Sequence, residues 1–102
     1  MIITKAFAVA SARISVLLNV DAAGGECGAS AVRVVLLTED RKPIAGGKAE
    51  VARTKGRAVE VQWKGRESPS AWINVGVTPG TRLRLHFKLL GSARLYAFRV
   101  RS

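Results

Sequence analysis

Apolar and polar residues alternate with a period of two along most of the chain, most strictly between Thr81 and Leu89. The odd-numbered residues of this segment from Leu83 onward are apolar: Leu83, Leu85, Phe87 and Leu89. The even-numbered residues, which form the other parity, are Arg82, Arg84, His86 and Lys88. Successive side chains of a strand point to opposite faces, so this pattern predicts a strand with one apolar and one cationic face.

Alternation of the same kind predicts a series of further strands. The segment Arg94–Val100 is apolar on both parities, which is typical of a strand inside a sheet or between two layers. Ala31–Leu37 is apolar on both parities except for Arg33, and we expect it to be an inner strand. The other expected strands are Ile2–Val9, Arg13–Val20, Lys48–Arg53, Ala58–Lys64 and Ala71–Val77.

Turn-forming residues separate these segments, and no stretch shows the 3.6-residue spacing of an amphipathic helix. The expected turns are Asp21–Gly25, Thr38–Pro43, Thr54–Arg57, Gly65–Ser70 and Thr78–Gly80, and Ile44–Gly47 is expected to end a segment. About eight short strands at this spacing predict an all-β fold with little or no helix. We therefore expect a single antiparallel β-sandwich of jelly-roll type that spans residues 1–102 as one domain.

The chain is strongly basic, with 17 Lys and Arg against 7 Asp and Glu and a net charge of +10. The last acidic residue is Glu67, so the C-terminal third carries only positive charge. Such an excess favours polyanionic partners, and it also occurs on solvated surfaces that bind nothing. No segment reaches the roughly 18 apolar residues that a membrane span requires, and we expect no membrane partner.

Few residues have the chemistry of an active site or a metal site. Cys27 is the single cysteine and His86 the single histidine, which excludes a tetrahedral zinc site within one chain. Glu60 and Glu67 are the acids that could act as a hydrolytic pair, but their positions on a strand and in a loop indicate surface charges. Asp21 and Asp40 could contribute to a structural calcium site, although turn bonding explains both. We expect neither an enzyme nor a cofactor.

Several stretches occur together in an order that resembles a known kind of domain: ITKAFAVASARISVLLNVDAAGG, VRVVLLTEDRKPIAG, VEVQWKG and TRLRLHFKLLGSARLYAFRV. They resemble the C-terminal β-sandwich, akin to lectin and glucanase-like jelly rolls, of secreted or cell-surface bacterial proteins related to glycoside hydrolases. The resemblance implies a non-catalytic accessory domain beside a catalytic neighbour, outside the cell or on its surface. The basic loop after Gly46 and the segment 70–79 depart from that pattern.

Two groups of residues are candidate binding sites. Trp72 has the opposite parity from Ile73, Val75 and Val77, so it could present a flat ring to a sugar, with Asn74 beside it. Trp63 shares its parity with Val59 and Val61 and is expected in the core. The cationic row Arg82, Arg84, His86 and Lys88, extended by Arg33, Arg94 and Arg99 if their strands are neighbours, could bind nucleic acid or a sulfated glycan.

Three functions remain open from the sequence. The first is an accessory module that binds carbohydrate or packs against a catalytic domain. The second is a polyanion-binding module that uses the cationic row. The third is a structural domain that self-associates and buries an exposed strand edge.

Overall fold

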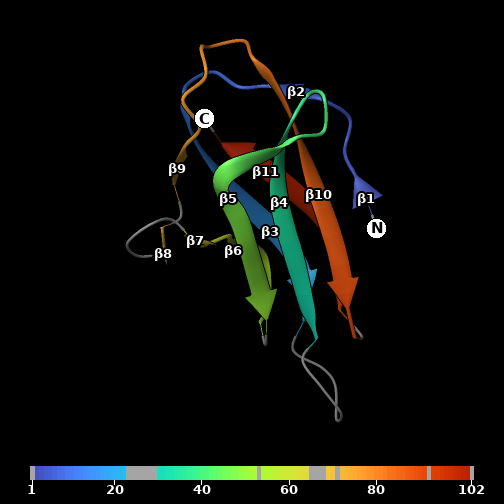
Figure 1. Cartoon of the computed structure of the whole chain (residues 1–102). Helices are drawn as coiled ribbons and strands as arrows, with labels where there is room; N and C mark the ends of the chain where they lie inside the picture. Colours follow the sequence, from blue (N-terminus) through green and yellow to red (C-terminus); the bar gives the residue numbers. More distant parts are fainter. Residues whose placement is uncertain are drawn as a thin grey trace.

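The computed structural model describes residues 2–22, 30–52, 54–64, 69–70, 72–91 and 93–101. These residues form strands, turns and connecting segments without a helix. Two antiparallel sheets pack face to face, which confirms the predicted all-β sandwich (Figure 1). Cys27 and Glu67 lie outside the described residues.

The first sheet has the strand order β1–β10–β4–β5, and β2 also pairs with β10. Its strands are β1 (Ile2–Ile3), β2 (Phe7–Ala8), β4 (Ala31–Thr38), β5 (Pro43–Ala52) and β10 (Arg82–Leu90). The second sheet has the order β11–β3–β6, with β9 also pairing with β3. Its strands are β3 (Arg13–Asp21), β6 (Lys55–Glu60), β9 (Ile73–Asn74) and β11 (Arg94–Arg101). A separate short pair consists of β7 (Trp63–Lys64) and β8 (Pro69–Ser70).

The chain passes repeatedly from one sheet to the other. β3 pairs with β11 in the second sheet, and the next strand, β4, pairs with β10 in the first. The pair β4–β10 therefore lies within the chain segment enclosed by the pair β3–β11, on the opposite sheet. The β4–β5 hairpin stays within the first sheet and places β4 between β5 and β10, in agreement with its prediction as an inner strand.

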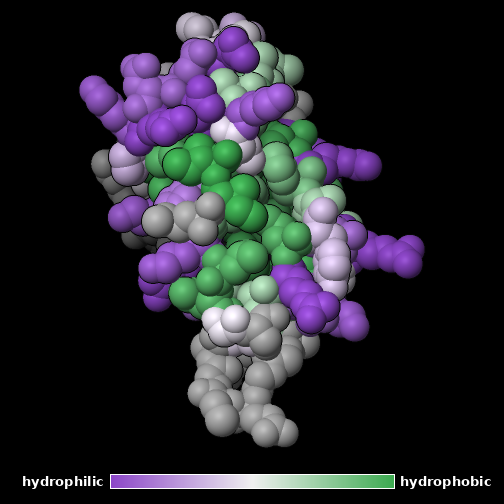
Figure 2. Space-filling model, turned by 90° about the vertical axis from the view of Figure 1, so that its right-hand side faces the viewer, coloured by the Kyte–Doolittle hydropathy of each residue, from purple (hydrophilic) through white to green (hydrophobic). Residues whose placement is uncertain are grey.

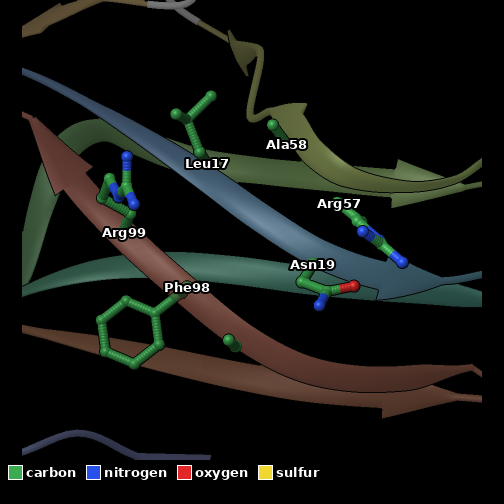
Figure 3. Close-up of a pocket in the computed structure, with 7 residues that line it drawn as sticks. Leu17, Asn19, Arg57, Ala58, Phe98 and Arg99 are labelled. Atoms are coloured by element: carbon green, nitrogen blue, oxygen red, sulfur yellow. The ribbon is translucent and has the colours of Figure 1, made fainter.

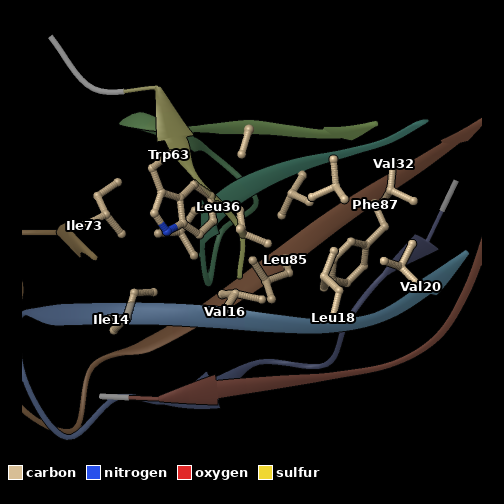
Figure 4. Packing of buried hydrophobic residues seen from close by; sticks show 14 of the residues in the cluster. Ile14, Val16, Leu18, Val20, Val32, Leu36, Trp63, Ile73, Leu85 and Phe87 are labelled. Carbon is tan, nitrogen blue, oxygen red and sulfur yellow. The ribbon is translucent and has the colours of Figure 1, made fainter. Parts of the chain in front are cut away.

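The core lies between the two sheets and is built by the alternating residues that the sequence indicates. Leu83, Leu85 and Phe87 of β10 are at most 1% exposed, and they face side chains from β3 across the sandwich (Figure 4). The buried residues of β3 are Ile14, Val16, Leu18 and Val20. Trp63 is 1% exposed and packs in the same cluster, as predicted (Figure 4).

β11 does not occupy the interior position that its composition predicts. It is an edge strand that pairs with β3, and its side chains Tyr96 and Phe98 are 61% and 40% exposed. Leu89, expected to point inward with its neighbours in β10, is 39% exposed. The prediction was wrong because both edge and interior strands can be apolar, and only the pairing of strands distinguishes them.

Three boundaries also differ from the expected ones. β5 begins at Pro43, although Thr38–Pro43 was expected to be a turn and Ile44–Gly47 to end the segment. The strand continues through these residues because Gly46 adopts φ 75° and Gly47 fits closely against Leu36. The expected basic turn Thr54–Arg57 lies largely in β6. Within the expected strand Ala71–Val77, the structure assigns strand only to Ile73–Asn74.

Candidate functional site

The residues predicted to bind sugar lie together at one end of the second sheet. Trp72 is 37% exposed, and β9 pairs Asn74 with Arg13 of β3. The guanidinium carbons of Arg101 and Arg13 lie 5.3 and 5.9 Å from the centroid of the Trp72 ring. Guanidinium groups at this distance make favourable cation–π contacts, so a sugar ring would compete with arginine for the indole. The Asn74 side chain accepts a hydrogen bond from the Gly76 amide at 2.9 Å and serves a local turn.

Arg101 is held in place over Trp72 by two further contacts. Its Nε donates to Oγ of Ser15 at 2.9 Å, and Ser15 is fully buried. Its Nη2 donates to Oε1 of Glu60 at 3.3 Å. Arg101 is therefore a structural residue that ties β11, β3 and β6 together beside the indole, and Glu60 is its ion-pair partner.

The cationic row of β10 is also largely occupied by contacts within the chain. Arg82 forms an ion pair with Glu39 at 3.8 Å. Arg84 donates to the backbone oxygens of Glu39 and Thr4 at 3.0 and 3.2 Å, which binds the N-terminal segment to the sheet. His86 is half-buried with an enclosed Nε2, whereas Lys88 is exposed.

The arginines proposed to extend this row are divided between the two sheets. Arg33 lies opposite Lys88, but it forms an ion pair with Glu50 at 3.2 Å. Arg94 and Arg99 belong to β11 in the second sheet, so they do not join the row. Among the described residues, the candidate row of β10 is therefore extended only by Arg33, and Arg33, Arg82 and Arg84 are engaged by contacts within the chain.

Acidic residues of the described chain do not gather into a site. Asp21 lies 4.0 Å from Nζ of Lys55, and Asp40 sits exposed in the turn after β4. Within the described ranges, no three His, Cys, Asp or Glu side chains come close enough to hold a metal ion.

A different group of residues forms a trough on the outer face of the second sheet, and two β-bulges meet there. On one side of β3, Leu18 pairs with Val59 and Val20 with Gly56, so two residues of β6 stand opposite Asn19. On the other side, β11 has an extra residue between Leu95 and Ala97 at the same level of β3. Bulges bend and twist a strand and frequently re-aim side chains beside binding sites.

The trough has a volume of about 260 Å³ and spans all three long strands of this sheet (Figure 3). Its lining residues are Leu17, Asn19, Arg57, Ala58, Ala97, Phe98 and Arg99. Arg57 and Arg99 are exposed and come from the two edge strands, whereas Asn19 is half-buried in the central strand. Ala58 and Ala97 leave the floor open because their side chains are small.

The electrostatics of this trough favour an anionic ligand. Neither Arg57 nor Arg99 forms an ion pair or a side-chain hydrogen bond with another described residue. A guanidinium group can bind a carboxylate or sulfate through two parallel hydrogen bonds, and the amide of Asn19 can bind a hydroxyl. The arrangement suits an acidic group presented on a hydroxyl-rich molecule.

Sequence reasoning did not assemble this site. In the sequence, Asn19 lies on the polar parity of its strand, Arg57 ends a predicted turn, and Arg99 is a candidate extension of the cationic row Arg82–Lys88. The paired bulges that bring them together depend on strand pairing over long sequence distances, and no local motif marks them.

Comparisons with known proteins leave the chain without an assigned family. No protein-family model matches the sequence, and neither a curated protein nor a solved structure matches the chain. The described part of the chain contains no helix with the length and apolarity that crossing a bilayer requires.

Proposed function

We propose that the chain is a non-catalytic β-sandwich module that binds an anionic glycan, carboxylated or sulfated, across the trough of the second sheet. The observation that carries this proposal is the pair Arg57 and Arg99, which have no ion-pair partner among the described residues and lie on either side of Asn19. The resemblance to accessory domains of glycoside-hydrolase-like proteins supports a polysaccharide as the ligand class.

The charge around the trough adds to this support. Among the described residues, the cations on or beside this outer face include Lys55, Arg57, Arg94, Arg99 and Arg101. The described carboxylates that neighbour them are Asp21 and Glu60, each already within 4.0 Å of one of these cations. The surplus positive charge raises the local concentration of a polyanion and makes its binding sensitive to salt.

Several features favour a glycan over nucleic acid and over catalysis. Single-stranded nucleic acid binders stack bases on aromatic side chains that lie among the basic residues. The aromatic residue that lines the trough is Phe98, which comes from the inward-facing parity of β11 because it pairs with buried Leu18. The glutamates Glu39, Glu50 and Glu60 each form an ion pair, which does not suit a proton donor of a glycosidase.

The proposal is tested by titrating the protein with polygalacturonate, dextran sulfate, neutral dextran and single-stranded DNA at two salt concentrations. Arg57→Gln and Arg99→Gln should each weaken binding to the acidic glycan by about tenfold or more, because a hydrogen bond to a charged group contributes about 1.5–3 kcal/mol. Arg82→Gln is the matched control, since it removes one exposed arginine from the opposite sheet.

Equal binding of neutral dextran would contradict the proposal, as would preferential binding of DNA. Weaker binding in Arg82→Gln with no effect of Arg57→Gln and Arg99→Gln would move the site to the cationic row of β10. A circular dichroism spectrum equal to that of the unaltered protein shows that each variant is folded, so that a loss of affinity can be attributed to the changed residue in the trough.

A further inference from the structure

On one side of the sandwich, side chains that point inward between the two sheets are nevertheless exposed to solvent. Ile2 pairs with Phe87, and Phe98 pairs with Leu18. Phe87 and Leu18 are fully buried, so Ile2 and Phe98 also point between the sheets, yet they are 47% and 40% exposed. Directly paired residues of neighbouring strands share one face of a sheet, so this exposure means that the edge strands β1 and β11 do not close the sandwich.

Two hollows follow this open side and meet at Phe98. The first, of about 320 Å³, is lined by Ile2, Phe87, Leu95, Tyr96, Ala97 and Phe98. The second, of about 390 Å³, is lined by residues 4–8 together with Phe98 and Val100. We call the lining formed by Ile2, Phe7, Leu95, Tyr96, Phe98 and Val100 the apolar seam, of which Ile2, Tyr96 and Phe98 are exposed and the others half-buried. Figure 2 shows apolar surface along this side of the molecule, with hydrophilic residues beside it.

The seam runs beside an edge of the second sheet that has no neighbouring strand in the described part of the chain. β11 pairs with β3 in a regular register from Ala97 to Arg101, and its other edge carries no described strand. On the facing sheet, β1 and β2 are 2 residues long each and cover little of the side. An unpaired edge offers backbone N–H and C=O groups to an added strand.

Positive side chains border the seam. Lys5 lines the second hollow, and Arg94 and Arg99 lie on β11. None of these three forms an ion pair with a described acidic residue. A second copy of this chain would bring the same cations against them, and each copy carries a net charge of +10. Charge complementarity therefore favours an acidic occupant over a dimer.

We propose that the seam binds an extended acidic segment of a partner protein as an additional strand on β11. Alternate apolar side chains of this segment enter the two hollows beside Phe98, and the carboxylates between them face the cations Lys5, Arg94 and Arg99. Backbone hydrogen bonds to β11 supply affinity, and because side chains of an added strand alternate between its two faces, the segment should alternate apolar and acidic residues. The hollows of the seam lie between the sheets and the arginine trough lies on the outer face, and the two surfaces adjoin at Phe98 and Arg99 of β11.

The probe is a peptide as long as β11, 8 residues, that alternates valine with glutamate. Its comparisons are a peptide of the same composition with the valines and glutamates in separate blocks, and a peptide that alternates valine with lysine. Binding is measured by fluorescence anisotropy, and hydrogen exchange reports on the amides of β11. The alternating acidic peptide should bind and should slow the exchange of amides between Ala97 and Arg101, whereas the other two should not.

Ile2→Glu and Tyr96→Glu, at exposed positions of the seam, should each weaken the binding of this peptide by about tenfold, through repulsion and loss of apolar contact. Val35→Glu on the outer face of the first sheet is the matched control, and it should bind as the unaltered protein does. None of these positions lines the trough, so glycan affinity should remain unchanged in all three variants.

Three outcomes would overturn the proposal. Equal binding of the block peptide would mean that charge alone attracts it. Absence of any binding, or of protection in β11, would mean that the edge does not accept a strand. Sedimentation that reveals a dimer, with loss of the dimer in Ile2→Glu and Tyr96→Glu, would make a second copy the occupant.

Discussion

The rings of Phe87 and Phe98 lie 5.3 Å apart with an interplanar angle of 49°, and they join the two sheets at the open side of the sandwich. Phe87 belongs to β10 and is fully buried, whereas Phe98 belongs to β11 and is 40% exposed. A tilted pair at this distance is a favourable aromatic arrangement. The pair therefore links the core to the apolar seam, which begins where the packing of the core stops.

Truncation of the two rings should have unequal effects on stability. Phe87→Ala should lower the free energy of unfolding by about 3–5 kcal/mol, as the loss of a fully buried phenylalanine does. Phe98→Ala should lower it by about 1–2 kcal/mol, because part of its ring is already in water. Urea denaturation of the single and double variants should give a coupling energy of about 0.5–1.5 kcal/mol. Strict additivity would mean that the ring contact contributes nothing of its own.

Arg101 should shield Trp72 from solvent. Arg101→Gln removes the guanidinium 5.3 Å from the indole centroid, a contact that contributes about 0.5–1 kcal/mol at an exposed site. Acrylamide quenching reports mainly on Trp72, because Trp63 is 1% exposed. We expect stronger quenching in Arg101→Gln and no change in Arg82→Gln, the control on the other sheet. Unaltered quenching in Arg101→Gln would show that other groups cover the indole.

Ser15 should be required for the position of Arg101. Its buried hydroxyl accepts the Nε hydrogen bond at 2.9 Å, so Ser15→Ala should lower the free energy of unfolding by about 1 kcal/mol. Ser11→Ala is the control, because the Ser11 hydroxyl bonds locally to the Arg13 backbone. Thermal denaturation of both variants provides the comparison, and an equal loss in the two would argue against a special role of the buried hydroxyl.

The neighbouring glycines of β5 should respond to alanine for different reasons. A Cβ added to Gly47 would lie 2.8 Å from Cβ of Leu36, which is fully buried and cannot move away. Gly47→Ala should therefore lower the free energy of unfolding by about 1–3 kcal/mol through overpacking. Gly46 has space for a Cβ but adopts φ +75°, so Gly46→Ala should cost about 1–2 kcal/mol through backbone strain.

Asparagine distinguishes these two causes, because it tolerates positive φ better than alanine does. Gly46→Asn should recover part of the stability lost in Gly46→Ala, and Gly47→Asn should be less stable than Gly47→Ala. Guanidinium denaturation at one temperature suffices for the series. The reverse order at either position would contradict the assigned cause.

The buried indole of Trp63 should tolerate loss of its N–H better than loss of its volume. Its Nε1 has no hydrogen-bond partner among the residues that the structure describes, and an unsatisfied buried donor costs about 1–3 kcal/mol. Trp63→Phe removes that donor along with part of the ring, so the two effects should largely cancel. Trp63→Ala should cost about 3–5 kcal/mol, because a cavity replaces the ring. If urea denaturation gave the same loss of unfolding free energy for Trp63→Phe and Trp63→Ala, the indole N–H would have a hydrogen-bond partner in solution.

The arginines illustrate how far the sequence could identify a site. The alternation in β10 correctly placed Arg82 and Arg84 outside the core, but it could not show that Glu39 and Thr4 engage them. Thr4 and Arg84 are 80 positions apart, and only folding brings them together. Arg57 and Arg99 carried no local signal of their role, because the trough that joins them arises from two bulges around Asn19.

The sequence by itself determined the class of fold and most of the core. A period of two is a local property of an extended backbone, so the inward parity of β3 and β10 could be read directly from the order of residues. The tertiary structure alone decided that β11 is an edge, that the sandwich has an open side, and which arginines lack a partner in the described part of the chain. These features depend on contacts between strands that are distant in the chain, for which the local order of apolar and polar residues contains no information.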